Sequence, residues 1–340
     1  MKFGVEEEFF LLDRDDYVTG RNQRVFMREA ANVLSSKIRE RNEIDNLPEK
    51  INRDYENGYL SIKFDSTFNT LEIAYPPFEN LAPFENLSRE IFSKLKLLSE
   101  TMGLEIVRKG YLPIPVNENS FFKKNNVKKT TERVPAAILP YDQFYHGRSC
   151  GTHIHLDFDI DLGFRNLRAY YALEPLLSML YSNSQRSEAH NYRLLLLQNA
   201  FNPDYIFYGF PEIIFENNNI YNDHKLKNKQ TWRDYSLIVP RTNKTWEFRA
   251  SCVQENLEKL YELITVRANL VTAINDKLVN VDTLTKMATR EYFLTAIRSL
   301  TDAKLKQYIR ELESSGVFDI LCDHQGLDML INNLIKTQNL

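Results

Sequence analysis

The residues best suited to chemistry lie in four short segments in which polar and apolar side chains alternate. Residues two apart in a β-strand point to the same side of the sheet, so each segment would present its polar groups on one face. The polar groups are of unusual types: four carboxylates, two of the chain's six histidines and one arginine, namely Glu6, Glu8, Glu72, His153, His155, Glu247 and Arg249. A half-exposed sheet also alternates, so the signal lies in these residue types and not in the alternation.

The third segment, residues 150–157, shows the clearest division of faces. His153, His155 and Asp157 fall on one side, and Ile154 and Leu156 fall on the other. Asp157 would share the face of the two histidines, which leaves it open as an added ligand or a substrate contact. The first segment divides less cleanly, because Glu7 lies between Glu6 and Glu8 on the apolar side, where its type alone predicts no role.

Four carboxylates on one surface would repel one another unless a cation lay among them. Hard divalent cations prefer oxygen ligands, and Mg²⁺ or Mn²⁺ suits a carboxylate-rich set that includes one histidine. Arg249 beside Glu247 suits a different task, because a guanidinium group binds phosphate or carboxylate in a bidentate manner. Metal ions and arginine together are how proteins stabilise a transferring phosphoryl group. If the four strands share one sheet, the sequence predicts a site for metal and phosphate.

Each motif also has an ordinary structural interpretation. The run from Glu6 to Glu8 resembles a solvated charge run, and Glu247 with Arg249 resembles a cross-strand ion pair. Glu72 by itself indicates nothing. The prediction therefore depends on the combination of the motifs and on their order along the chain.

The elements that would position these groups follow from hydrophobic periodicity. Apolar residues at steps of three and four predict helices over 84–98, 167–180 and 257–268, and the tail 301–340 also reads as helical. Strand-like runs are expected at 2–12, 59–64, 68–75, 105–111, 152–158, 235–239 and 245–251. The spacing of 59–64 and 68–75 indicates an antiparallel hairpin. Strands mixed irregularly with helices favour an α+β fold with one curved antiparallel sheet backed by helices.

Two stretches are polar and read as loops, 117–133 and 216–233. Their basic residues fit either a solvated surface or a lid over phosphate. The 340 residues suffice for one large domain. We expect a single catalytic domain over 1–340, with a helical C-terminal part from about residue 254.

The bulk composition excludes several classes of protein. A formal net charge of -3 gives no preference for nucleic acid or an anionic membrane. Three cysteines without a CxxC pair argue against a disulfide framework and a zinc ribbon. Acidic residues directly after the first residues do not fit a signal peptide, and no stretch has the length and apolarity of a membrane span. We expect a cytoplasmic protein that binds neither nucleic acid nor membrane.

The order of the motifs resembles that of type 2 glutamate–cysteine ligases, within the glutamine synthetase superfamily. Residues 4–9 resemble the opening G-[IV]-E-x-E strand of these ligases, and 70–74 resemble their L-E-[IL]-A strand. Residues 151–155 are similar to G-x-H-[VI]-H, and 246–249 are similar to [VT]-E-x-R. The segment 191–193 resembles the one that carries an arginine after the family's long helix. The resemblance covers roughly residues 3 to 270.

This resemblance implies a glutamine synthetase-like catalytic domain that uses ATP and Mg²⁺ (or Mn²⁺). It implies a ligase that joins an amino-acid carboxylate, with the glutamate γ-carboxylate as a candidate, to an amine through an acyl phosphate. Amino acids or peptides would be the substrates. By analogy with the superfamily, the chain could also form a homo-oligomer. The implied metal ligands are Glu6, Glu8, Glu72, His153 and Glu247. His155 would lie near the nucleotide phosphates, and Arg193 and Arg249 would contact phosphate or a substrate carboxylate.

Several positions depart from the family pattern near the expected substrate end, namely 109–113, 156–157 and 251–252. They put the substrate in question more than the ATP chemistry. Cys150 and Cys252 are more often buried small hydrophobes than reactive groups. Two other functions remain open: a metal-dependent phosphotransferase and a non-catalytic paralogue that binds nucleotide.

Overall fold

A computed structural model describes residues 1–13, 20–42, 45–65, 68–113, 149–184, 191, 193–194, 237–241, 244–289, 291–292 and 303–322. The two predicted polar loops, 117–133 and 216–233, lie outside these residues. The chain forms two compact units, Met1–His155 with Cys252–Glu258, and Leu156–Ser251 with Lys259–Leu340. The expectation of one catalytic domain stays a prediction.

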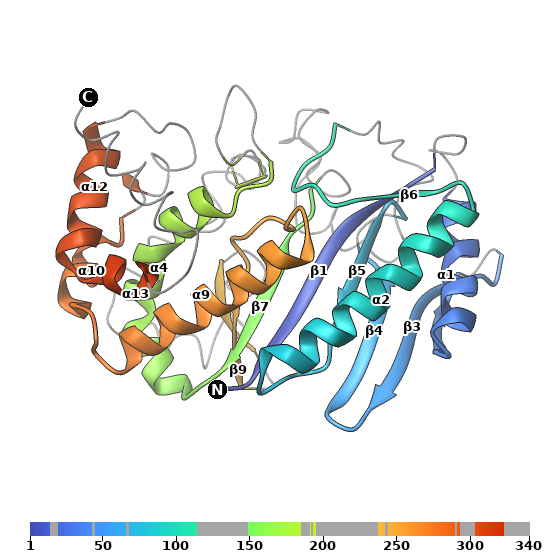
Figure 1. The fold of residues 1–340 in the computed structure, drawn as a ribbon, viewed down its shortest axis with the longest axis horizontal. Coiled ribbons are helices and arrows are strands. Elements are labelled where there is room, and N and C mark those ends of the chain that lie inside the picture. Colours follow the sequence, from blue (N-terminus) through green and yellow to red (C-terminus); the bar gives the residue numbers. More distant parts are fainter. Residues whose placement is uncertain are drawn as a thin grey trace, which may run out of the picture. The chain divides into compact units, whose positions relative to one another are not determined.

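The first unit is built on an antiparallel sheet (Figure 1). Its strands lie side by side in the order β2 (Lys37–Arg41), β3 (Pro48–Tyr55), β4 (Gly58–Phe64), β5 (Thr70–Ala74), β1 (Phe3–Leu12) and β7 (Thr152–Asp157). The short strand β6 (Glu105–Val107) also pairs with β1. The last two residues of β7 belong to the second unit. The predicted hairpin is confirmed, because β4 and β5 pair antiparallel with Ile62 opposite Ile73.

One face of this sheet is apolar and packs against helices α1 (Arg21–Val33) and α2 (Leu81–Thr101) (Figure 1). Ile51, Ile62 and Ile73 lie opposite one another on β3, β4 and β5 and are fully buried. Phe9 of β1 lies edge-on to Phe92 of α2, with 6.2 Å between ring centroids. Burial of this face leaves the other face of the same strands for polar groups.

Two strands and one helix of the first unit lack a clear signal in the sequence. The strand β3 has mixed charged and apolar residues without strict alternation, and β2 consists almost wholly of exposed charged residues. The helix α1 buries two polar side chains, Gln23 and Arg24, so its apolar stripe is interrupted. Strand pairing and packing decide the structure of β2, β3 and α1, because intrinsic strand and helix propensity is only a weak guide for these segments.

The second unit is mainly helical. It contains α4 (Ile160–Leu180), most of α9 (Leu257–Asn275), α10 (Val281–Met287), α12 (Ala303–Ser314) and α13 (Val317–Cys322), with the strand pair β8 (Ile238–Pro240) and β9 (Thr245–Phe248). The predicted helices at 167–180 and 257–268 are confirmed, and the described part of the tail is helical. No helix in the described part of the chain combines the length and apolarity needed to cross a membrane.

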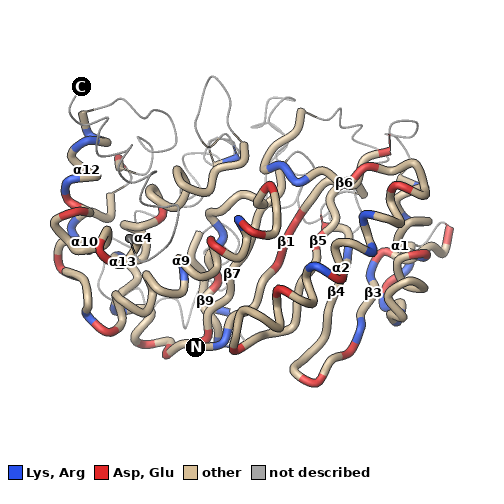
Figure 2. The backbone as a smooth tube through the Cα atoms, viewed as in Figure 1, with Lys and Arg blue, Asp and Glu red and all other residues tan. Residues whose placement is uncertain are grey.

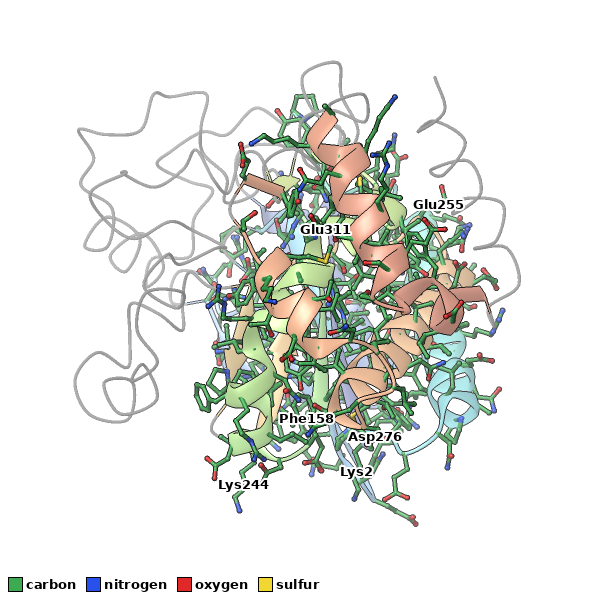
Figure 3. All side chains as sticks on the ribbon, turned by 90° about the vertical axis from the view of Figure 1, so that its left-hand side faces the viewer. Lys2, Phe158, Lys244, Glu255, Asp276 and Glu311 are labelled. Atoms are coloured by element: carbon green, nitrogen blue, oxygen red, sulfur yellow. The ribbon has the colours of Figure 1, made fainter. Side chains whose placement is uncertain are left out.

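The start of α4 fits closely against β9. Asp159 caps the helix, and its Oδ1 accepts a hydrogen bond of 2.7 Å from the Leu162 N–H. Gly163 faces the Trp246 indole so closely that an added Cβ would lie 2.1 Å from the indole nitrogen. Phe158, labelled in Figure 3, stacks on the same indole with 6.1 Å between ring centroids. The absence of a side chain at Gly163 therefore lets α4 approach the strand that carries Glu247.

The middle of α4 contains Pro175, which cannot donate the usual helical hydrogen bond. The Tyr308 hydroxyl of α12 enters the helix at this point, where it donates to the Ala172 carbonyl at 2.7 Å and accepts from the Leu176 N–H at 3.1 Å. The buried Arg267 guanidinium of α9 pairs with the Glu174 carboxylate. Polar contacts thus hold α4, α9 and α12 together around Pro175.

Candidate functional site

A row of charged side chains crosses three strands on the polar face of the first unit. The strand register places Glu8 of β1 opposite Glu72 of β5, and Glu72 opposite Lys63 of β4. Residues opposite one another in an antiparallel sheet share a face. The Lys63 Nζ lies 2.9 Å from the Glu72 Oε1, and the Glu8 Oε2 accepts a hydrogen bond of 2.7 Å from the Gly151 N–H. Figure 2 shows the acidic residues along β1.

The two histidines of β7 meet this row at its β1 side. The His153 Nδ1 lies 3.3 Å from the Glu6 Oε2, and the His155 Nε2 lies 3.4 Å from the Glu6 Oε1. The His153 Nε2 is 3.8 Å from the Glu8 Oε1. Five of the residues singled out in the sequence thus lie together in the first unit, namely Glu6, Glu8, Glu72, His153 and His155.

Asp65, at the end of β4, belongs to the same cluster although the sequence patterns did not reveal it. One oxygen atom each of Glu8, Asp65 and Glu72 lie within 4.8 Å of one another. The available signal was the hairpin register, because Asp65 lies two residues after Lys63 and so on the same side of β4. Only the pairing of β4 with β5 shows that this side is the side of Glu72.

Burial and mutual repulsion set the protonation of these carboxyl groups. Burial, followed by the charge of Glu6, raises the pKa of Glu72 to about 8; Lys63 opposes this rise, and Asp65 and Glu8 add to it. Burial alone would also raise the pKa of Glu6, but hydrogen bonds from His153 and His155 hold it well below its ordinary value.

The pKa of Lys63 responds to the same charges. Burial alone would lower it, but Glu72, Asp65 and Glu6 raise it above the ordinary lysine value. One ammonium group thus faces several carboxyl groups. A cluster rich in oxygen donors and short of positive charge fits a hard divalent cation.

The remaining predicted residues lie in the second unit. Glu247 of β9 is fully buried, and its carboxylate is paired with the Arg241 guanidinium and lies 3.6 Å from the Arg249 Nε. Arg241 was not predicted from the sequence. It lies just after β8, where its backbone N–H donates to the Thr245 carbonyl at 2.8 Å and closes the turn between β8 and β9. This turn brings Arg241 to Glu247.

Arg193 is almost fully buried and contacts the main chain beside Arg249. Its Nη1 lies 3.2 Å from the Arg249 carbonyl oxygen and 3.4 Å from the Ala250 carbonyl oxygen. Its backbone N–H donates to the Ser184 hydroxyl at 3.0 Å. These contacts hold the chain directly after β9 in place. The expected contact of Arg193 with phosphate or substrate stays a prediction.

Glu7, for which the sequence indicated no role, forms an ion pair in the interior. It lies on the apolar face of β1 opposite Ile73, fully buried, and its carboxylate is paired with Arg108. The Arg108 Nε also donates to the Gln254 carbonyl at 2.8 Å. Glu7 is therefore part of the support beneath Glu6 and Glu8.

The two cysteines near the site are buried, as expected for small hydrophobic residues. Cys150 packs in an apolar cluster with Phe10 and Val253, and Cys252 forms a β-bridge with Gly151. Asp157, in contrast, is exposed. Its proposed role as a ligand or substrate contact has no geometric support among the described residues of its own unit.

No protein-family model and no curated protein sequence matches this chain. Among solved structures, its fold is similar to that of a bifunctional glutathione synthetase from Pasteurella multocida, with a TM-score of 0.50 and 11% sequence identity over 99% of this chain. The chain spans about half, 47%, of that protein. A glutamate–cysteine ligase from Francisella tularensis in complex with AMP matches with a TM-score of 0.48 and 13% identity, over 99% of this chain and 88% of the other.

The first of these similarities shows the fold alone. It supports the α+β class with an antiparallel sheet and helices, which the strand registers of the first unit confirm. The finer assignment to a glutamine synthetase-like domain and to the type 2 glutamate–cysteine ligases stays a prediction.

Proposed function

We propose that this protein is an ATP- and Mg²⁺-dependent ligase that joins an amino-acid carboxylate to an amine through an acyl-phosphate intermediate. One observation carries the proposal: Glu6, Glu8 and Glu72 share one face of an antiparallel sheet with His153 at their edge. Buried carboxylates at this density need a cation, and phosphoryl transfer is a reaction in which such a cation is useful. The similarity of fold to a bifunctional glutathione synthetase agrees with the proposal.

The side chains of the cluster have distinct tasks in this reaction. Glu6, Glu8, Glu72 and His153 would hold Mg²⁺, which when bound draws charge from the phosphate oxygens. The Gly151 N–H fixes the Glu8 carboxylate through its Oε2. His155 contacts the Glu6 carboxylate and so orients it, as residues behind metal ligands commonly do. The resemblance of sequence motifs assigns Glu247 to the same metal set, and this assignment is part of the proposal.

Two arginine side chains are the proposed contacts for phosphate or a substrate carboxylate. Arg249 is half-buried beside Glu247, and a guanidinium group there suits the oxygens of a phosphate or a substrate carboxylate. Arg193 would act mainly by holding the main chain at Arg249 and Ala250. A carboxylate is a poor acyl donor because its leaving group is oxide, and phosphorylation makes that oxygen leave readily as phosphate. The amine then attacks the carbonyl carbon, and correct placement of the two substrates supplies much of the rate.

The test measures ADP formation with Mg²⁺ across a panel of amino acids and amines, with the glutamate γ-carboxylate as the first acid to try. We expect ADP release that depends on both an acid and an amine. Release that no acid or amine in the panel stimulates would contradict the ligase proposal. Stimulation by a phosphoryl acceptor without an amine would indicate a phosphotransferase instead.

The site assignment is tested separately with Glu6→Gln and His153→Ala. Both variants should lose metal-dependent turnover while their circular dichroism and melting temperature stay near those of the wild type. Glu79→Gln is a matched control, because the Glu79 and Lys2 side chains of this ion pair are both exposed. Wild-type turnover in both site variants would remove the assignment even if the ligase activity itself is present.

A further inference from the structure

Lys63 brings an ammonium group to the carboxylates of the acidic cluster. It stands in the charged row directly opposite Glu72, and its Nζ contacts the Glu72 Oε1 at 2.9 Å. The Glu72 side chain is only 6% exposed, so it has few other positions to adopt. Glu72 in turn lies with Asp65 and Glu8 in a group whose oxygens approach within 4.8 Å of one another. By oxygen geometry alone, this group would accept a divalent cation.

An ammonium group and a divalent cation exclude each other from such a group. Mg²⁺ binds carboxylate oxygen at about 2.1 Å in a near-octahedral set of oxygen ligands, whereas Lys63 already bonds one of the carboxylate oxygens in this group. A lysine ammonium cannot act as a ligand, and its charge repels a dication a few ångströms away. Glu72 therefore has one cation partner built into the fold.

The other side of Glu8 has a different chemistry. There an imidazole faces the carboxylates, with the His153 Nε2 3.8 Å from the Glu8 Oε1 and the His153 Nδ1 3.3 Å from the Glu6 Oε2. A neutral imidazole can be a metal ligand, and its charge does not compete with the ion. The cluster is thus divided at Glu8 into a side with a lysine and a side with histidines.

We propose that Lys63 serves as a resident cation at Asp65 and Glu72, and that it confines divalent metal to the side of Glu6, Glu8 and His153. This removes Glu72 from the set of four metal ligands given in the proposed function and leaves the other three. The inference rests on the proposed function for the presence of metal at the cluster, and it deepens that function by setting where metal binds. Lys63 is a positioning residue in this account, because it acts through Glu72 and Asp65 and not on the reacting atoms.

The test measures Mn²⁺ binding directly, by electron paramagnetic resonance of free Mn²⁺, on the full chain without ATP or substrate. Lys63→Met removes the charge and keeps a side chain of similar length. We expect it to bind one more Mn²⁺ per chain than the wild type, or to bind Mn²⁺ on the order of tenfold more tightly. Lys63→Arg keeps the charge and should bind as the wild type does. The added binding should disappear when Asp65→Asn is combined with Lys63→Met.

Lys37→Met is the matched control, since Lys37 pairs with Asp54 on the same sheet at 2.6 Å but both side chains are exposed. It should leave Mn²⁺ binding unchanged. Equal Mn²⁺ binding by Lys63→Met and the wild type would overturn the inference, as would an equal gain in Lys37→Met.

Thermal melting extends the test to a variant that is poorly folded without metal. A larger Mn²⁺-induced rise in melting temperature in Lys63→Met than in the wild type supports the inference. A Lys63→Met variant that stays unfolded in Mn²⁺ refutes it. These readouts contain no nucleotide. A protein without ligase activity can therefore still confirm the role of Lys63, and an active ligase can refute it.

Discussion

The buried ion pair beneath the site offers a sharp test of how the sheet is held. Glu7 is 1% exposed at its side chain and Arg108 is 6% exposed. Arg108 also donates to the Gln254 carbonyl at 2.8 Å, and its guanidinium carbon lies 4.9 Å from the centre of the Phe92 ring. Replacing Glu7 by Gln keeps the shape of the side chain but removes the negative charge that is paired with the buried Arg108 guanidinium.

The expected cost follows from that burial. Removing one partner of a buried ion pair destabilises a protein by about 3–5 kcal/mol, because the remaining charge stays out of water. For a cooperative unit of the size of the first unit, this corresponds to a fall in Tm of roughly 10 °C. Arg108→Met in the Glu7→Gln background should recover part of the loss, since it removes the buried charge and keeps contact with Phe92.

The assay is urea unfolding of the wild type, the two single variants and the double variant, which together give the coupling free energy of the pair. Asp54→Asn is the control, because its ion pair with Lys37 is exposed and should matter little. A loss below about 1 kcal/mol in Glu7→Gln, the range of a surface pair, would refute the reasoning. The same result would mean that Glu7 does not support the strand of Glu6 and Glu8.

Two further predictions concern packing and pH. Gly163→Ala should destabilise the protein by about 1–3 kcal/mol, because its Cβ would overlap the Trp246 ring. Gly4→Ala is the control, since its Cβ would meet only an ordinary contact at 3.6 Å and should change stability little. Urea unfolding measures both. Burial opposes the ionisation of Asp45, but its hydrogen bond from Arg24 lowers its pKa below the ordinary value. The ionised carboxyl therefore stabilises the fold above pH about 4, and this contribution is lost as pH falls through the lower folded value. Asp45→Asn should flatten the pH dependence of unfolding in that acidic range, and an unchanged slope would contradict the assignment.

Periodicity predicted much of the fold because it reports burial on one face. The apolar stripe at 84–98 predicted α2, and alternation predicted β1, β4, β5 and β7 within a few residues of their ends. Strand β2 gave no such signal, since its side chains are mostly exposed and charged. Its structure depends on hydrogen bonds to β3, which are main-chain contacts that side-chain type scarcely encodes.

The candidate site divides in the same way. Five site residues could be predicted from the sequence, because each occupies the polar side of its own strand: Glu6, Glu8, Glu72, His153 and His155. The basic residues that pair with carboxylates could not be predicted. Lys63 and Arg241 are ordinary basic residues in the sequence, and only the register of β4 on β5 and the turn after β8 place them on carboxylates.

By itself, the sequence determined which faces are polar, because alternation within a strand needs no partner to define it. Tertiary structure decided which residue lies opposite which, since a shift of one residue in register would turn every side chain to the other face. That register set Glu72 between Glu8 and Lys63, and placed Glu7 against the apolar core, where only an ion pair with Arg108 makes its charge tolerable.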